Sequence, residues 1–263
     1  MQAKSIEEVI SQLEVIIEEC ISNRSRLGYF AALYNRVTQS VREGIRQGEF
    51  LDGPRMERLD VMFANRYLTA YSQYKAGELP SRSWLKAFEA AGNPDLVVLQ
   101  HLLIGMNAHI NLDLAVAAAR TSPGNQLAPL EPDFNRINTV LAALTPLVEQ
   151  EIDQESPVFR WLTKIAPSLE LKAVGFAMDE AREAAWHFAN KLAFLTAEQQ
   201  VSAMASRDME VAILGDLVLA RNPLFQFIHS DESTDVAENI RILAKGEFKI
   251  AVPTEAVPVA KVG

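Results

Sequence analysis

Apolar residues recur every three or four positions along most of the chain, a spacing that predicts amphipathic helices. Ser5-Ile-Glu-Glu8 has the form of a capping box at the start of the first helix. No convincing alternating strand and no internal repeat is found. The predicted helices cover residues 5–20, 26–47, 52–77, 83–91, 95–120, 131–152, 157–165, 168–195, 196–220 and 235–245.

The short segments between these helices suit antiparallel neighbours in one helical domain. We therefore expect an all-α fold, with residues 1–245 forming a single multi-helix, bundle-like domain around a buried central helix at about 95–120. Residues 246–263, with Pro253 and Pro258, are expected to form a flexible tail. A second domain after about Ser156 stays open as an alternative, although no linker composition marks it.

The central helix at 95–120 is apolar on every side, which predicts burial all round. It nevertheless carries six polar residues in two main groups. An unpaired buried polar side chain costs about 1–3 kcal/mol, so such a set must form a network or hold a ligand. Gln100, Asn107 and Asn111 share one side, His109 and Asp113 share another, and His101 lies between the groups, about 12 Å from His109 along the axis.

The third predicted helix places Asp60 in the middle of its apolar face. A carboxylate there must be paired, hydrogen-bonded or protonated unless it is half-exposed. Its candidate partners are His101 or His109 across the interface, or Arg66 and Arg182.

On residues 168–195, Arg182 borders the apolar face one turn from Trp186, so its guanidinium could hold an anion, pair with Asp60 or stack on the indole. Asp179, Glu183 and His187 form a stripe roughly opposite the apolar face. That stripe is interpreted as a solvated surface.

Composition narrows the function classes for this chain of 263 residues. A net charge of −9 without a Lys/Arg run argues against a general nucleic-acid binder. Cys20 is the single cysteine, which excludes an intramolecular disulfide. The N-terminus carries Glu7 and Glu8 and no apolar signal segment, and no stretch of about 20 uninterrupted apolar residues occurs. We expect a cytoplasmic protein that does not span a membrane, of unknown oligomeric state.

Three stretches resemble an uncharacterised all-helical bacterial family, known as a domain of unknown function. They are residues 99–114, which contain the string Asn-Ala-His-Ile-Asn-x-Asp, together with 59–68 and 133–138. The resemblance runs from about Tyr29 to Leu243, with Met178 as a small departure where a β-branched residue is expected. It implies an all-α fold and no particular activity.

Known catalytic motifs are missing from the sequence, including a Gly-rich phosphate loop, a Gly-x-Ser-x-Gly elbow and His-Glu-x-x-His. We expect neither a cofactor nor a tightly held metal. His101 and Asp113 lie about 18 Å apart on one straight helix, and His109 with Asp113 alone is a weak chelate. Asp60 would complete a metal site only if its helix crosses at that level.

Two hypotheses follow. In the first, the chain is an enzyme that acts on a small, partly apolar molecule by acid–base or metal-assisted chemistry. His109 would transfer the proton, Asp113 and Asp60 would orient it, and Asn107 and Asn111 would polarise the substrate, while His101 is a further catalytic candidate. In the second, the protein binds a small molecule or a partner helix without turnover and the polar core is structural. A site for an anion at Arg66 and Arg182 suits either hypothesis.

Overall fold

A computed structural model of the chain describes residues 2–138, 178–221, 223–230 and 232–245. Within these ranges the regular elements are helices and no strand occurs, so the predicted all-α class is confirmed. The helix expected at 157–165, parts of those at 131–152 and 168–195, and the expected tail lie outside the described residues. Residues 131–138 are helical as expected.

Most of the helix boundaries fall within two residues of the predicted ones. The helices are α1 Ile6–Ser22, α2 Leu27–Arg46, α3 Gly53–Lys75, α4 Arg82–Ala90, α5 Val98–Ala108, α6 Ala115–Thr121, α10 Met178–Ala193, α11 Ala197–Leu219, α12 Pro223–His229 and α13 Val236–Ala244. Helix α12, which begins at Pro223, was not predicted, because proline often ends a helix. Proline also suits the first turn of a helix, where its missing N–H needs no partner.

Side-chain caps explain where several helices begin. The Ser5 hydroxyl accepts from the backbone N–H of Glu8 at 3.3 Å. The Glu8 carboxylate accepts from the backbone N–H of Lys4, so the expected capping box is formed only by its Ser half. A second capping box, formed by Thr196 and Gln199, is complete.

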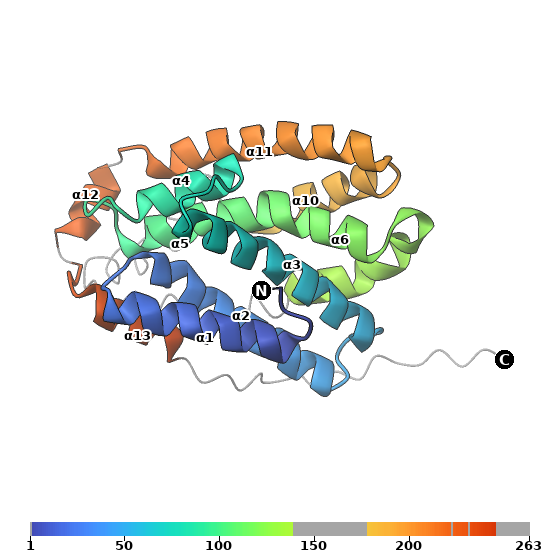
Figure 1. Ribbon diagram of the computed structural model, residues 1–263, viewed down its shortest axis with the longest axis horizontal. Coiled ribbons are helices and arrows are strands. Elements are labelled where there is room, and N and C mark those ends of the chain that lie inside the picture. The colour runs from blue at the N-terminus through green and yellow to red at the C-terminus, as the bar shows by residue number, and fades with distance from the viewer. Residues whose placement is uncertain (1, 139–177, 222, 231, 246–263) are drawn as a thin grey trace.

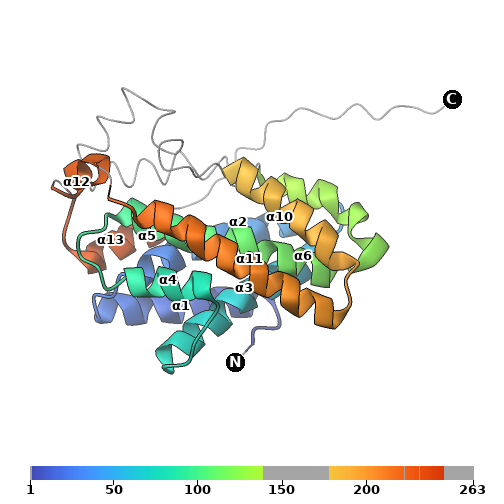
Figure 2. The same cartoon turned by 90° about the horizontal axis from the view of Figure 1, so that it is seen from above.

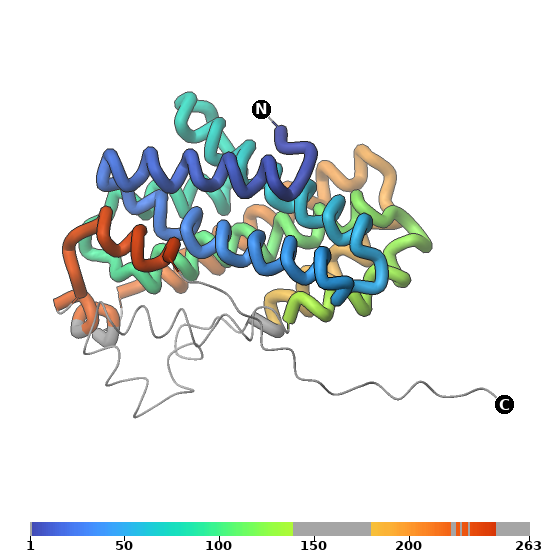
Figure 3. Tube along the Cα trace, turned by 90° about the horizontal axis from the view of Figure 1, so that it is seen from below, coloured from blue at the N-terminus to red at the C-terminus, as the bar shows by residue number. Residues whose placement is uncertain are grey.

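The helices pack in layers around the central segment, Val98–Thr121, which consists of α5, α6 and the turn between them (Figure 1). Helices α1, α2 and α13 pack together on one side (Figure 3), and α3 contacts α6. On the other side α11 runs along α4 and α5, and α10 packs on α6 (Figure 2). One apolar core links buried side chains from Ala3 to Leu243. The central segment supplies more of these side chains than any other helix.

The central helix is not the single α-helix expected at 95–120. It begins at Val98, and residues His109–Leu114 form a π-helical turn between α5 and α6. By length and composition alone Val98–Thr121 would suit a membrane span, a test that buried core helices also pass. Here 94% of the apolar window lies buried inside the described fold.

Helices α2 and α5 approach each other closely at Gly105. A Cβ atom added to Gly105 would lie 2.5 Å from the ring of Phe30. The absence of a side chain at this position therefore lets Phe30 reach the central segment one turn before His109.

Gly105→Ala is expected to destabilise the protein by about 1–3 kcal/mol, because overpacking outweighs the gain in helix propensity. Gly53→Ala is the matched control, since its added Cβ would meet its nearest neighbour at an ordinary 3.4 Å. Urea denaturation followed by circular dichroism measures both. Equal stability of the two variants would contradict the close approach.

Candidate functional site

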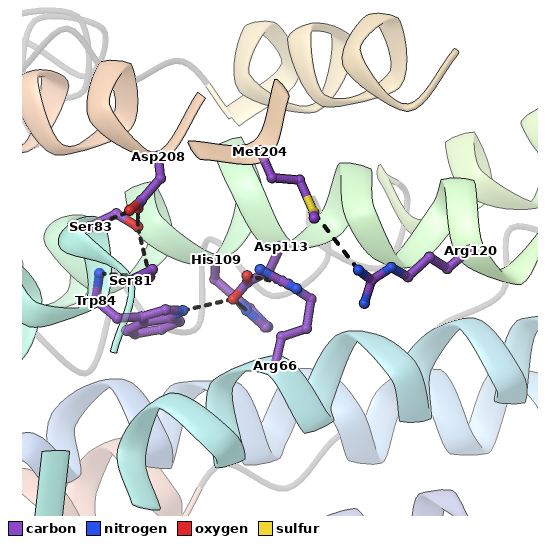
Figure 4. A network of polar contacts seen from close by, with 9 residues as sticks. All are labelled: Arg66, Ser81, Ser83, Trp84, His109, Asp113, Arg120, Met204 and Asp208. Atoms are coloured by element: carbon purple, nitrogen blue, oxygen red, sulfur yellow. Dashed lines mark hydrogen bonds and ion pairs between the residues drawn. The ribbon is translucent and has the colours of Figure 1, made fainter. Parts of the chain in front are cut away.

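The carboxylate of Asp113 lies at the centre of the polar cluster and has no exposed surface. Arg66 of α3 donates its Nε–H to Oδ1 at 2.5 Å, and Trp84 of α4 donates its indole N–H to Oδ2 at 2.7 Å (Figure 4). The Nδ1 atom of His109 lies 3.5 Å from Oδ2. Three structural elements therefore converge on one carboxylate.

These neighbours decide the charge of Asp113. Burial by itself would raise the pKa of the carboxyl group, but Arg66, His109 and Trp84 together outweigh it and leave the pKa below its ordinary value. Asp113 is therefore an ionised carboxylate in a buried position, and its attraction to Arg66 compensates for the loss of water.

The imidazole of His109 is enclosed by five aromatic rings, which we call the aromatic cage. Phe63 stacks on it with ring centroids 3.6 Å apart and planes 9° apart, and Tyr34 meets it edge-on at 4.4 Å. The cage consists of Phe30, Tyr34, Phe63, Tyr67 and Trp84, contributed by α2, α3 and α4.

Burial lowers the pKa of His109 and outweighs the opposite effect of Asp113, while Arg66 lowers it further. The imidazole is therefore neutral at pH 7. Because the Nδ1 atom faces an ionised carboxylate, the proton of the neutral ring belongs on Nδ1. The Nε2 atom is then a lone-pair acceptor, and it is buried without a hydrogen-bond partner among the described residues.

The surrounding helices fix this geometry from a distance. Asp208 of α11 accepts hydrogen bonds from the hydroxyl and the backbone N–H of Ser83 (Figure 4). It also accepts one from the backbone N–H of Arg82, and the three distances are 2.6–3.0 Å. This contact holds the start of α4 and so positions Trp84. His109 and Asp113 themselves lie on the π-helical turn, a distortion that often occurs at functional sites.

Asp60 is buried on α3, as its place on the apolar face predicted, and its Oδ2 atom has no hydrogen-bond partner among the described residues. Burial, with a smaller effect of Glu57, raises the pKa of Asp60 to about 7. Burial, and to a smaller extent the charge of Asp60, raises the pKa of the Tyr34 hydroxyl. The ion pair considered between Asp60 and Arg66 is not formed, because Arg66 binds Asp113.

The amide side chains of the central segment bind α11 or one another, and not the aromatic cage. Gln100 and Asn107 donate to the backbone carbonyls of Val218 and Val211 at 2.9 and 2.8 Å. Asn111 donates to the Asn107 side chain at 3.1 Å. The two polar groups expected from the helical wheel therefore face different partners, and the amide group has a structural role.

His101 does not join the aromatic cage. Its ring packs against Tyr29 with centroids 5.5 Å apart, two helical turns before His109. Burial, with a smaller effect of Arg26, lowers the pKa of His101 to about 3. This residue is a neutral core histidine whose Nε2 atom has no partner among the described residues.

Arg182 is buried, as expected for an inward-reaching group. Its described contacts tie it to the helical residues 131–138, where it donates to the Asn138 side chain and to the carbonyl of Phe134 and lies over the Phe134 ring at 4.6 Å. The ring on which it lies is therefore Phe134 and not the indole of Trp186, and the described contacts include no pair with Asp60.

The stripe on α10 is a solvated surface, as predicted for the part that can be described. The side chains of Glu183 and His187 are 74% and 76% exposed and lie 3.7 Å apart. The side chain of Asp179 lies outside the described residues. Where the structure is described, no three His, Cys, Asp or Glu side chains gather in a way that could hold a metal ion.

Sequence reasoning missed Trp84, Tyr34 and Arg120. A buried indole needs a partner for its N–H, so the tryptophan on a short amphipathic helix was a signal that could have been followed. Trp84, Asp113 and Arg66 also form part of the lining of a pocket of about 840 Å³ that opens to solvent, and Arg120 lies on its wall. The pocket thus extends to the residue whose buried carboxylate faces His109.

The fold and the site together define the class of this protein. It is an all-helical domain with a buried carboxylate–histidine pair beside an open pocket. The chain matches a family of unknown function (DUF5995) over residues 6–221 and belongs to that family. The predicted membership is confirmed, and the match starts and ends earlier than the expected 29–243. No curated protein and no solved structure matches the chain.

Asp113→Asn is expected to destabilise the protein toward the lower end of the ~3–5 kcal/mol range for breaking a buried ion pair, since Arg66 keeps 25% of its side chain exposed. Asp216→Asn, which breaks the pair with Lys86 while its own side chain is 65% exposed, should change stability by less than about 1 kcal/mol. Chemical denaturation compares them. A similar loss in both variants would contradict the role of Asp113.

Asp60 makes stability depend on pH in a defined direction. Its pKa is about 7 in the folded chain against an ordinary 3.8, so the folded state binds more protons between these values and stability falls as pH rises from about 4 to 7. The free energy of unfolding of Asp60→Asn, relative to that of wild type, should therefore rise by about 2–4 kcal/mol between pH 4 and pH 8.

Denaturation curves at both pH values test this, with the exposed Asp95→Asn as control. If the difference between Asp60→Asn and wild type is the same at both pH values, Asp60 is not protonated in the fold.

Proposed function

We propose that the protein is an enzyme that acts on a small, partly apolar molecule by general acid–base chemistry, with His109 as the base. The observation that carries this proposal is that the two nitrogen atoms of the His109 imidazole have opposite surroundings. Nδ1 faces an ionised, doubly fixed carboxylate, whereas Nε2 is buried and has no partner among the described residues. A neutral histidine oriented in this way has an accepting lone pair ready for a proton.

The proton that His109 accepts would be stabilised by Asp113. An imidazolium beside an ionised carboxylate at 3.5 Å gains an attraction that grows as the charge develops. Arg66 opposes this gain, because its charge already lowers the pKa of His109. The balance keeps the imidazole neutral before reaction and lets it take up a proton during reaction.

Tyr34 and Asp60 are the proposed acid partners. The Tyr34 ring meets the imidazole at 4.4 Å, and its hydroxyl is buried beside the Thr38 side chain. Asp60, whose pKa is about 7, holds a proton over part of the neutral pH range. Either group could donate to a substrate atom that gains negative charge, and a low-polarity surrounding strengthens such a hydrogen bond.

The pocket beside Asp113 and Trp84 is the proposed route of entry. It stops short of the imidazole, so a cage side chain must move for substrate to reach Nε2. Phe63 is the half-buried member of the cage, while the other four rings are buried. Asn107, Asn111, His101 and Arg182 are left out of the proposed catalytic group because of the contacts described above.

The alternative is a protein that binds a small molecule without turnover. The hydrogen bonds that the Asn107 and Asn111 amides make within the fold favour it, since they assign part of the polar core to holding helices together. The two functions differ in one respect that can be measured, which is whether a proton of the bound molecule is exchanged.

His109→Gln is expected to lower a proton-transfer activity by about 10²–10⁴-fold, the usual contribution of a positioned acid or base. The assay incubates wild-type protein in D₂O with a library of small carboxylates, phosphates and carbonyl compounds and detects deuterium uptake or conversion by mass spectrometry.

His187→Gln is the matched control, since that side chain is 76% exposed. Full activity in His109→Gln, or the lack of any exchange or conversion by the wild type across the library, would contradict the proposal.

A further inference from the structure

The lining of the 840 Å³ pocket is cationic, although the chain as a whole carries a net charge of −9. The helices α3 and α6 and the N-terminal segment supply these charges. The charged lining residues are the cations Lys4, Arg58, Arg66 and Arg120 and the acidic residues Glu57 and Asp113. Asp113 is already paired with Arg66, so positive charge predominates over the rest of the wall.

Arg120 lies at the end of α6 and extends toward Arg66 and Met204 (Figure 4). Its described contact is a weak one, from Nη2 to the sulfur of Met204 at 3.9 Å. No carboxylate of the described residues lies within ion-pair distance of Arg120, Arg58 or Lys4 in this structure. These three side chains therefore bring positive charge to the pocket, and no carboxylate of the described residues neutralises that charge.

Arg66 can take part in two contacts at once. A guanidinium has five N–H donors in a planar fork, and Arg66 gives its Nε–H to Asp113. Its terminal amino groups have no described partner and belong to a side chain that lines the pocket and is 25% exposed. They can donate to a ligand without breaking the ion pair that fixes Asp113.

Two guanidiniums next to each other repel unless an anion lies between them. Arg66 and Arg120 line the same pocket, and burial, followed by the charge of Arg66, lowers the pKa of Arg120. The fork geometry of arginine suits the paired oxygens of a carboxylate or a phosphate group. Val61, Met62 and Trp84 line the same pocket and offer an apolar surface to the rest of such a molecule.

We propose that this pocket binds the carboxylate or phosphate group of a small molecule between Arg66 and Arg120, with Lys4 and Arg58 near its mouth. The anionic group would place the body of the molecule against Trp84 and toward Asp113 and His109. That the bound molecule is the substrate rests on the proposed function, whereas the anion site itself can be measured without any turnover.

Calorimetric titration at low salt tests the site with two probes, inorganic phosphate and benzoate. Wild type should bind at least one of them saturably with one site, and the tighter of the two identifies the preferred anion. Arg120→Gln should weaken that binding at least tenfold, because it removes a charge without touching the Asp113 pair. Arg66→Lys should weaken it as well, since an ammonium group lacks the fork.

Arg46→Gln is the matched control, because Arg46 is an exposed arginine at the end of α2, away from the pocket lining. Its binding should equal that of wild type, and thermal melts should show that all variants are folded. The absence of saturable binding of both probes by wild type, or equal affinity of Arg120→Gln and wild type, would overturn the anion site.

The two proposals fail separately. Saturable anion binding together with unaltered proton exchange in His109→Gln would support the pocket and contradict the enzyme. Proton exchange that depends on His109, without anion binding, would contradict the pocket alone.

Discussion

The burial of one ionised carboxylate, that of Asp113, is the constraint on which the rest of the site depends. A buried charge is strongly unfavourable unless it is paired and hydrogen-bonded. Arg66 and Trp84 meet that requirement from two helices, and His109 faces the same oxygen as Trp84. Helices α3 and α4 are therefore held against the central segment at a defined level, and any change that moves one of them alters the others.

The polar residues of the central segment form two groups with different contacts, because the segment is buried on both sides and each group faces a different set of helices. Toward α11, amide side chains satisfy backbone carbonyls and join helices. Toward α2, α3 and α4, ionisable groups are enclosed by aromatic rings, and several of their atoms have no partner among the described residues. In the first arrangement each amide donates a hydrogen bond within the fold. The second resembles a binding or reaction site, because it has hydrogen-bonding capacity that the described fold does not use.

The sequence predicted much of this arrangement. Helical periodicity located most of the described helices, and the wheel correctly separated Asn107 and Asn111 from His109 and Asp113. It could not predict the π-helical turn, because no residue pattern distinguishes that turn from a continuous α-helix in one sequence. The pairing of Asp113 with Arg66 and Trp84 depends on how distant helices cross, which periodicity does not determine. Asp60 was correctly placed in the core, but its candidate partner Arg66 pairs with Asp113 instead.

The central claim is that an ionised Asp113 holds a neutral His109 with its proton on Nδ1. Imidazole ¹⁵N chemical shifts measured between pH 5 and pH 8, and assigned with His109→Gln, test it directly. The account predicts a neutral ring at pH 7, protonated on Nδ1, with a pKa below the ordinary 6.5. A ring that is doubly protonated at pH 7, or a neutral ring with its proton on Nε2, would contradict it.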